Sequence, residues 1–303
     1  MRKDVRSMIV TFMVPAVAIY LFAYLYPTLR TIAMSFFYTK SISAPLGTWE
    51  FVGFDNFKYL IDSKLFAQSL VNIGKIWVFG GAFTFFFAFL FAIILHNGVK
   101  GKAFWRAMIY LPNVISAIAM ANMWLLYVYS PKYGFLKNVF STFGMEKLAA
   151  IQWTSPERIF TSMVVAFSFG SVGFFMLIIL AGMERIPRDF YEASKIDGAS
   201  VPRQFFQITL PLLQPIVVTC LTFWTINVLS FFIWTQIFSA TNNDVHTITP
   251  VVYLFNYAFG PNSGSAGGLN AGLASSIGVV LGVLTIILFL VINSLNRGDR
   301  YEY

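Results

Sequence analysis

Six long apolar stretches are the feature that most constrains how this 303-residue chain can fold. A helix needs about 20 mostly apolar residues to cross the hydrocarbon core of a membrane. Because such a stretch must satisfy its own backbone hydrogen bonds, we expect helices. The predicted spans run near residues 8–29, 69–95, 107–130, 159–183, 211–240 and 269–295. No small-x-small cleavage site follows the first span, so we expect it to be permanent and not a cleaved signal.

The composition agrees with an all-α integral membrane protein. Hydrophobic residues make up 57% of the chain and charged residues 11%, whereas soluble domains average about 25% charged residues. The net charge of +8 is compatible with nucleic-acid binding, but the basic residues lie in short loops beside apolar spans. In such loops they set topology. We therefore expect contact with membrane lipid and none with nucleic acid.

Lysine and arginine are distributed unevenly over the loops. With the N-terminus inside, the inner segments 1–7, 96–106, 184–210 and 296–303 carry twelve of these residues. The outer segments 30–68, 131–158 and 241–268 are longer and carry eight. Because positive residues concentrate on the cytoplasmic side, both termini are expected to be cytoplasmic.

This pattern divides the chain into three parts. Residues 1–68 hold the N-terminal arm, the first span and an outer loop, and residues 69–295 hold a core of five spans. Residues 296–303 are expected to form a cytoplasmic tail. The run rich in glycine and serine at 261–268 predicts a loop.

The most informative loop is the polar, basic stretch 184–210 between the fourth and fifth spans. Pro187 suits the first turn of a helix, where its missing N–H costs nothing. Gly198 tolerates a left-handed backbone and so predicts the end of that helix. Ser200 and Pro202 then predict the start of a second short helix. We expect a helix–turn–helix on the cytoplasmic side.

The spacing within this loop resembles that of a known family. Glu192-Ala193-Ser194 is followed after three residues by Gly198, and after nine more by Ile208-Thr209-Leu210-Pro211. This is similar to the cytoplasmic loop of bacterial ABC-importer permeases, which reads Glu-Ala-Ala, three residues, Gly, nine residues, Ile-x-Leu-Pro. Ser194 replaces the second alanine and is also small. A loop that only anchors topology does not explain the full spacing.

The resemblance implies that this loop couples the chain to ATP-hydrolysing subunits. The residues that it assigns to this contact are Glu192, Ala193, Ser194, Asp197, Gly198, Ile208 and Pro211. It also implies the type I ABC-importer permease fold, with both termini cytoplasmic, in the bacterial inner membrane. The implied partners are a second similar permease, two ATPase subunits that use ATP and Mg²⁺, and an extracytoplasmic sugar-binding protein. The chain has no phosphate-binding Gly-x-x-x-x-Gly-Lys loop, so we do not expect it to be an enzyme.

Other motifs resemble the carbohydrate branch of this family, the maltose-permease type. Gly53-Phe54-Asp55-Asn56-Phe57 looks like the Gly-x-x-Asn-Phe segment after the first span. Arg106 with Leu111-Pro112 looks like the start of the third span, and Tyr133-Gly134 looks like the start of Tyr-Gly-x-x-Asn, with Asn138 one place later than usual. After the fifth span the family often has Thr-Gly-Gly-Pro, whereas this chain has Thr-Asn-Asn-Asp at 241–244.

Neutral polar and aromatic residues are the groups within the spans that suit a solute. Away from their ends the spans contain no Asp, Glu, Lys or Arg, and such residues usually mark ion or proton pathways. Neutral groups suit an uncharged sugar. In the fifth span, a stripe at helical spacing is predicted to share one face: Cys220, Trp224, Asn227, Phe231 and Trp234, flanked by Ser230.

Two interpretations of this stripe remain open. Either it lines the solute path, or its rings pack the helices and its amide joins neighbouring helices. Weaker candidates for the path, which are also typical of packing, are Asn122, Tyr127, Ser168 and Ser171. The two histidines, His96 and His246, are far apart and Cys220 is the single cysteine, so we expect no metal site.

We therefore expect the permease subunit of an ATP-driven importer for a sugar or oligosaccharide. An importer for another solute, such as glycerol phosphate or a polyamine, is the first alternative. An ion-coupled secondary carrier is the second, and the lack of charged residues within the spans argues against it.

Overall fold

The computed structural model describes residues 3–239, 244–260 and 268–294. The chain falls into two compact units: Met1–Ala67 with Tyr253–Val283, and Gln68–Val252 with Leu284–Tyr303. The division expected from the sequence placed 253–283 in the core, whereas the contacts of this segment lie with the N-terminal segment. The tail at 296–303, the turn at 241–243 and most of the 261–268 run lie outside the described residues.

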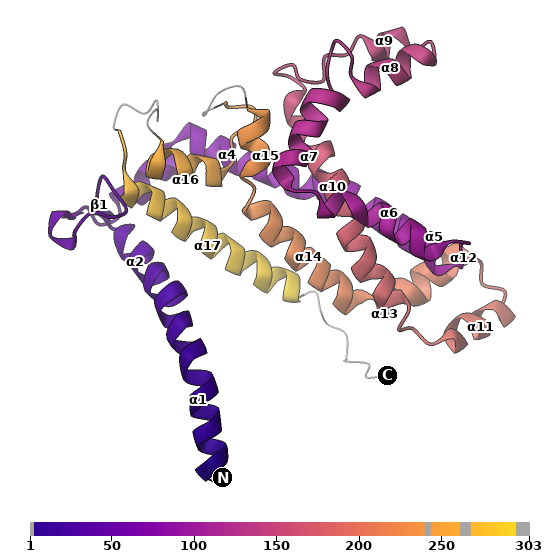
Figure 1. Ribbon diagram of the computed structural model, residues 1–303, viewed down its shortest axis with the longest axis horizontal. Helices are drawn as coiled ribbons and strands as arrows, with labels where there is room; N and C mark the ends of the chain where they lie inside the picture. Colours follow the sequence, from indigo (N-terminus) through magenta and orange to yellow (C-terminus); the bar gives the residue numbers. More distant parts are fainter. Residues whose placement is uncertain (1–2, 240–243, 261–267, 295–303) are drawn as a thin grey trace. The chain divides into compact units, whose positions relative to one another are not determined.

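The first unit combines helices from both ends of the chain with a short hairpin (Figure 1). The first span consists of α1 (Lys3–Tyr20), a π-helical turn (Leu21–Leu25) and α2 (Tyr26–Met34). The antiparallel hairpin β1 (Phe37–Tyr38) and β2 (Glu50–Phe51), with a 3-10 turn (Leu46–Thr48), leads to α3 (Asp55–Asp62). Most of α16 (Pro250–Phe259) and the first half of α17 (Ala271–Ser294) complete the unit.

Asn56, from the Gly-x-x-Asn-Phe segment, holds the hairpin of this unit in place. Its buried amide donates to the carbonyl oxygens of Ser35 (2.9 Å) and Phe37 (3.0 Å). Gly272, at the start of α17, packs on the same Phe37 carbonyl so closely that a Cβ there would overlap it. The motif therefore has a structural role in the loop that follows the first span.

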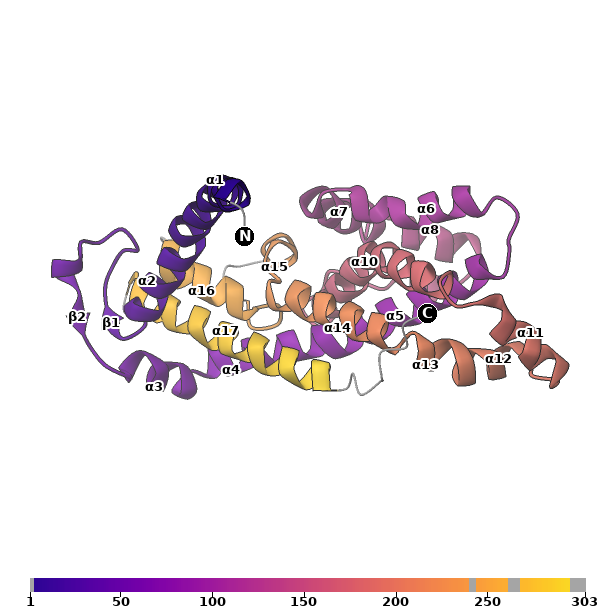
Figure 2. The same ribbon diagram turned by 90° about the horizontal axis from the view of Figure 1, so that it is seen from below.

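The second unit is built around α10 (Ile159–Met183), which packs against α5, α6, α14 and α15 (Figure 2). Before it come α4 (Lys64–Lys75), a π-helical turn (Ile76–Gly80), α5 (Gly81–His96), α6 (Lys102–Val114), α7 (Ala117–Met123) with a π-helical turn (Trp124–Val128), α8 (Phe135–Thr142) and α9 (Glu146–Ala149). After it come α11 (Arg188–Ile196), α12 (Val201–Gln204), a π-helical turn (Phe205–Thr209), α13 (Leu210–Leu212), α14 (Gln214–Leu229) and α15 (Ile233–Phe238).

Within the described residues, four unbroken helices are long and apolar enough to cross a membrane: Met8–Met34, Lys64–His96, Ile159–Met183 and Ala271–Ser294. Two further candidates are bent, Lys102–Val114 with Ala117–Val128 by 96°, and Val201–Leu212 with Gln214–Leu229 by 72°. The prediction of six spans is confirmed when each bent pair counts as one. The prediction of continuous helices over 107–130 and 211–240 is wrong.

Local backbone features accompany both bends. Ile115 has extended backbone (ψ 136°), and the Ser116 hydroxyl then caps α7 by accepting a hydrogen bond from the Ala119 N–H (3.3 Å). In the second pair, Pro211 and Pro215 flank the break between α13 and α14. Proline lacks an N–H and clashes with the preceding turn, which interrupts a helix.

Candidate functional site

Residues 184–210, here called the coupling segment, fold as the predicted helix–turn–helix between α10 and α14. Pro187 lies at the N-cap of α11, one position before the predicted first turn, with φ near −56°. Asp189 in the first turn and Lys195 in the last turn complement the helix dipole. The sequence of α11 therefore favours the helix before any partner binds.

Gly198 makes the turn between α11 and α12. Its φ is +75°, in the left-handed region that glycine adopts most readily. The Gly198 N–H donates to the Lys195 carbonyl (3.0 Å) and the Ala199 N–H to the Ser194 carbonyl (2.9 Å), which ends α11. Ser200 occupies the N-cap position of α12 as predicted, but its side chain accepts no capping hydrogen bond.

Side-chain hydrogen bonds tie the two halves of the coupling segment together. The Tyr191 hydroxyl lies 3.0 Å from the Thr209 hydroxyl, and the Gln204 amide donates to the Ala199 carbonyl (3.4 Å). Ser194, where the family pattern has alanine, donates its hydroxyl to the Tyr191 carbonyl (2.8 Å). Because this bond stays within its own helix, the substitution presents no free hydroxyl to a partner.

The tip of the coupling segment carries exposed apolar surface. Four of the expected coupling residues are exposed there: Glu192, Ala193, Asp197 and Gly198. Ile196 beside them is 88% exposed. The sequence pattern did not single it out, although an apolar residue directly before an Asp-Gly turn was the available signal. Near the other end of the segment Ile208 is half-buried, and just after it Pro211 is exposed in α13.

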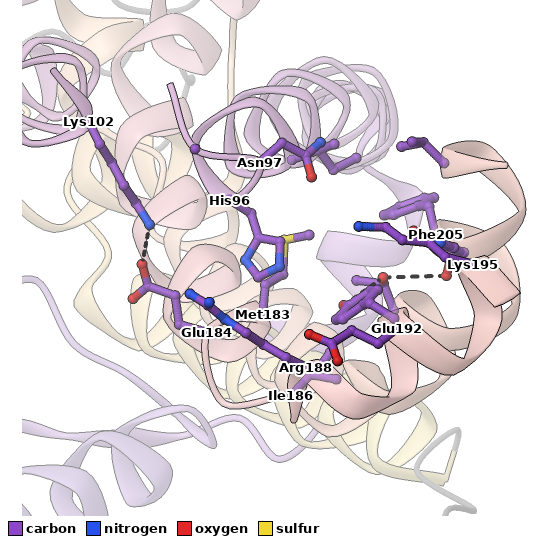
Figure 3. A pocket seen from close by; sticks show the side chains of 16 residues that line it. His96, Asn97, Lys102, Met183, Glu184, Ile186, Arg188, Glu192, Lys195 and Phe205 are labelled. Carbon is purple, nitrogen blue, oxygen red and sulfur yellow. Dashed lines mark hydrogen bonds and ion pairs between the residues drawn. The ribbon is translucent and has the colours of Figure 1, made fainter. Parts of the chain in front are cut away.

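A cavity of about 700 Å³ lies between the coupling segment and the ends of α5, α6 and α10 (Figure 3). The ionisable side chains that line it are His96, Lys102, Glu184, Arg188, Tyr191, Glu192 and Lys195. The cavity forms where segments distant in the sequence meet. The sequence patterns gave no signal for it.

Glu184 joins the start of α6 to the coupling segment at the edge of this cavity. Its Oε1 atom lies 2.6 Å from Lys102 Nζ and 2.9 Å from a guanidinium nitrogen of Arg106. The hydrogen bond from Lys102, helped by the charges of Lys102 and Arg106, lowers the pKa of the Glu184 carboxyl below its ordinary value. The carboxylate is therefore ionised at neutral pH.

The predicted stripe of the fifth span is not one face of a single helix. Because α14 ends at Leu229 and α15 begins at Ile233, Phe231 lies in the break and Trp234 on a second helix. Trp224, Phe231 and Trp234 are 1%, 2% and 8% exposed. Their ring centroids lie 5.4, 4.8 and 5.8 Å from that of Phe167. The aromatic members of the stripe thus form a buried cluster around α10.

Trp224 fills the space between α10 and the start of α5. Its indole N–H donates to the Trp77 carbonyl (3.0 Å), and the Trp77 indole donates to the Thr225 hydroxyl (2.9 Å). A Cβ on Gly81 would lie 2.8 Å from the Trp224 indole nitrogen, so the indole packs where Gly81 has no side chain. These contacts favour the packing interpretation for Trp224.

Asn227 and Ser230 lie on a different side of α14 from Trp224. Both are exposed. Within the part of the chain that the structure describes, neither side chain has a hydrogen-bond partner. They share this side with exposed neighbours at helical spacing, and we call the set the polar face of α14: Thr219, Phe223, Ile226, Asn227 and Ser230.

Three of the weaker pathway candidates bond within the chain. Ser168 is fully buried and donates to the Gly80 carbonyl (3.3 Å). Ser171 and Asn122 each donate to the carbonyl four residues earlier in the chain. Tyr127, by contrast, is 65% exposed. The hydrogen bonds of Ser168, Ser171 and Asn122 to backbone carbonyls indicate a structural role for these three side chains.

No cluster of three His, Cys, Asp or Glu side chains among the described residues is placed to hold a metal ion. Cys220 is fully buried.

Related proteins match most of the chain. The family described as binding-protein-dependent transport system inner membrane component matches residues 84–298. The diacetylchitobiose uptake system permease protein NgcF of Streptomyces coelicolor is 28% identical over 268 residues, which cover 84% of this chain and 74% of that protein. The trehalose/maltose transport system permease protein MalF of Thermococcus litoralis is 30% identical over 242 residues, covering 79% and 76%.

A solved structure has the same fold. The crystal structure of a bacterial ABC transporter involved in the import of the acidic polysaccharide alginate contains a chain that superposes with a TM-score of 0.79. It is 21% identical, and the match covers 97% of each chain. The predicted fold, that of an ABC-importer permease, is confirmed. With 215 of its residues matched by the family, 84–298, the chain belongs to the inner membrane components of binding-protein-dependent transport systems.

Proposed function

We propose that this chain is the membrane-spanning subunit of an ATP-driven bacterial importer for a sugar or oligosaccharide. The observation that carries the proposal is the polar face of α14, where the Asn227 amide and the Ser230 hydroxyl are exposed beside Phe223. Neutral donors and acceptors next to an aromatic ring suit an uncharged, hydroxyl-rich solute. Relatives named for uptake of diacetylchitobiose and of trehalose and maltose support the same solute class.

The importer requires partners of three kinds. We infer an extracytoplasmic sugar-binding protein, because the family is binding-protein-dependent and a transporter of the same fold was crystallised with an alginate pentasaccharide-bound periplasmic protein. We also infer a second permease of similar fold and two ATPase subunits that bind ATP and Mg²⁺. In this proposal the chain is non-catalytic and lies in the bacterial cytoplasmic membrane.

The coupling segment is connected through α13 to α14, the helix that carries the polar face. Closure of the ATPase subunits would displace the tip around Ile196 and Gly198. The Tyr191–Thr209 contact makes both halves of the segment move together. The second half continues through α13 to the break at Leu213, where α14 begins. A push on the tip would therefore be transmitted to the helix that carries Asn227, which is the movement that alternating access requires.

Two alternative functions are disfavoured by specific observations. Glycerol phosphate and polyamines are charged solutes, and the polar face of α14 offers them no opposite charge. An ion-coupled carrier does not fit membership of a binding-protein-dependent family.

Replacing Asn227 by Ala is expected to lower sugar uptake per assembled complex and to change preference between two competing sugars. The loss of a hydrogen bond to a neutral group costs about 0.5–1.5 kcal/mol, or roughly 2- to 13-fold in uptake. The measurement is uptake of labelled sugars into proteoliposomes, normalised to assembled complex. Ser171→Ala is the control, because that hydroxyl bonds within its own helix. If Asn227→Ala keeps the uptake and preference of the unmodified transporter, the polar face is not the solute path.

Cysteines placed at Lys58 and Lys147 are expected to react from outside the cell with an impermeant thiol reagent. Both positions lie on segments that the distribution of basic residues places outside, whereas Lys195 lies in the coupling segment. Lys195→Cys should therefore react only after the cells are opened. Cys220→Ala provides the background, since Cys220 is the single cysteine. Labelling of Lys195→Cys in intact cells would reverse the proposed orientation.

A further inference from the structure

Glu184 lies where α10 ends and the coupling segment begins. It is the C-cap residue of α10, and only Arg185, Ile186 and Pro187 separate it from α11. Ile186 is buried, so this short connection is itself anchored. Because the connection is short and Ile186 is buried, a displacement of α11 would also displace Glu184.

A single oxygen of Glu184 holds two side chains of α6. Lys102 Nζ and an Arg106 guanidinium nitrogen approach Oε1 at 2.6 and 2.9 Å. The two basic residues are four positions apart and so lie on the same side of α6. Arg106 belongs to a motif that resembles the start of the third span, but no sequence pattern predicted its partner. The two contacts join the first turns of α6 to the start of the coupling segment.

A second contact fixes α6 to α10 further into the helix pair. A Cβ on Gly173 would lie 2.6 Å from Tyr110 Cα and closer still to the Ile109 carbonyl oxygen. Nearby, the Asn113 amide donates to the Gly170 carbonyl (3.4 Å). Gly173 and Glu184 are eleven residues apart, or about 16 Å along a helix. Contacts at two levels of the helix pair thus connect α6 to α10.

The far end of α6 leads toward the break next to the polar face of α14. At Ile115 and Ser116 the chain bends by 96° into α7. α7 packs against α15, the helix that follows the break at 230–232. A rigid α6 would therefore carry displacement of the coupling segment to this break.

We propose that Glu184 is a positioning residue for transport, which transmits movement of the coupling segment to α6 and through α7 to α15. This inference rests on the proposed function, since it assigns a route for the same coupling. Its mechanical part, that Glu184 holds α6 to the end of α10, can be measured without a sugar.

The test uses the complete transporter with spin labels on α6 and α10. Phe104→Cys and Ala181→Cys are exposed labelling positions, in a Cys220→Ala background with cysteine-free partner subunits. With ATP bound, the distance between the labels is expected to be narrowly distributed in the unmodified protein and broadened by Glu184→Gln. Asp189→Asn removes an exposed acid outside these ion pairs and should leave the distribution unchanged. Identical distributions with Glu and Gln at 184 would overturn the proposal.

A transport measurement separates positioning from structural support. Glu184→Gln is expected to raise the ATP hydrolysed per sugar transported by about twofold or more, at unchanged basal hydrolysis. The variant that lacks both basic partners, Lys102→Gln with Arg106→Gln, should have the same effect, and adding Glu184→Gln to it should change nothing further. Reduced assembly with an unchanged ratio would instead assign Glu184 a structural role. If maltose, trehalose and diacetylchitobiose with the cognate binding protein all fail to stimulate the unmodified transporter, the proposed function fails and the label distances still test Glu184.

Discussion

Replacing Gly173 by Val is expected to remove most of the assembled protein from the membrane. At this position α6 and α10 touch through their backbones, and even the Cβ of alanine would meet Tyr110 Cα at 2.6 Å. A backbone atom cannot rotate away as a side chain does, so the helices must separate. Overpacking a core costs about 1–3 kcal/mol when side chains can adjust. We expect a larger effect here, measured as membrane abundance and thermal stability of the purified complex.

Gly170 provides a matched control on the same helix. A Cβ there has no heavy atom of another segment within 4 Å, and alanine favours a helix over glycine by about 0.5–1 kcal/mol. Gly170→Ala should therefore retain normal abundance and stability. If Gly173→Ala and Gly170→Ala are equally abundant and equally stable, the close approach of α6 and α10 does not support the fold.

Hydropathy predicted which segments form helices long and apolar enough to span a membrane, but not the direction of each helix. Ile159–Met183 coincides with the fourth predicted span, because this helix is apolar all round. The bends at Ile115 and at Leu213 escaped prediction, since an apolar window averages over residues without regard to backbone direction. Pro112 and Pro211 were visible signals. Their consequences depend on what packs beside them, which the sequence does not state.

The coupling segment was predictable because its information is local. The start of the first helix, the glycine turn and the start of the second helix each follow from residues within a few positions of one another. The structure contains all three in that order along the chain. Ile196 and the cavity were missed for different reasons. The exposure of Ile196 depends on how the coupling segment is placed relative to the ends of α10 and α14, between which it lies. The cavity depends on His96, Lys102 and Arg188 meeting from three elements.

The stripe in the fifth span shows where periodicity misleads. Helical spacing assigns Trp224 and Asn227 to one broad face, but they are about 60° apart around an ideal helix. That difference puts the indole into the core and leaves the amide exposed. Beyond Leu229 the helix ends, so the spacing no longer describes direction at all. The amide, not the rings, therefore remains the strongest solute-path candidate.

Replacing Gly198 by Val is expected to abolish most sugar uptake while the protein remains in the membrane at normal abundance. The residue has φ of +75°, and a Cβ there would meet nothing within 4 Å, so only the backbone conformation resists a side chain. A non-glycine residue in the left-handed region costs roughly 1–2 kcal/mol. A cost of this size lowers the population of the turn about 5- to 30-fold. The turn that presents Ile196 would then form too rarely to couple the ATPase subunits to transport. The measurements are uptake per complex and retention of the ATPase subunits during purification.

Gly198→Asn separates conformation from size, because asparagine also adds a side chain but enters the left-handed region far more readily than a β-branched residue. If the backbone angle is what coupling needs, Asn should retain a large part of the uptake that Val loses. Equal loss in both variants would mean that the ATPase requires the bare glycine surface at the tip. Normal uptake in both would remove Gly198 from the coupling contact, and the spacing from Glu192 to Pro211 would then have to be explained by the fold of the segment alone.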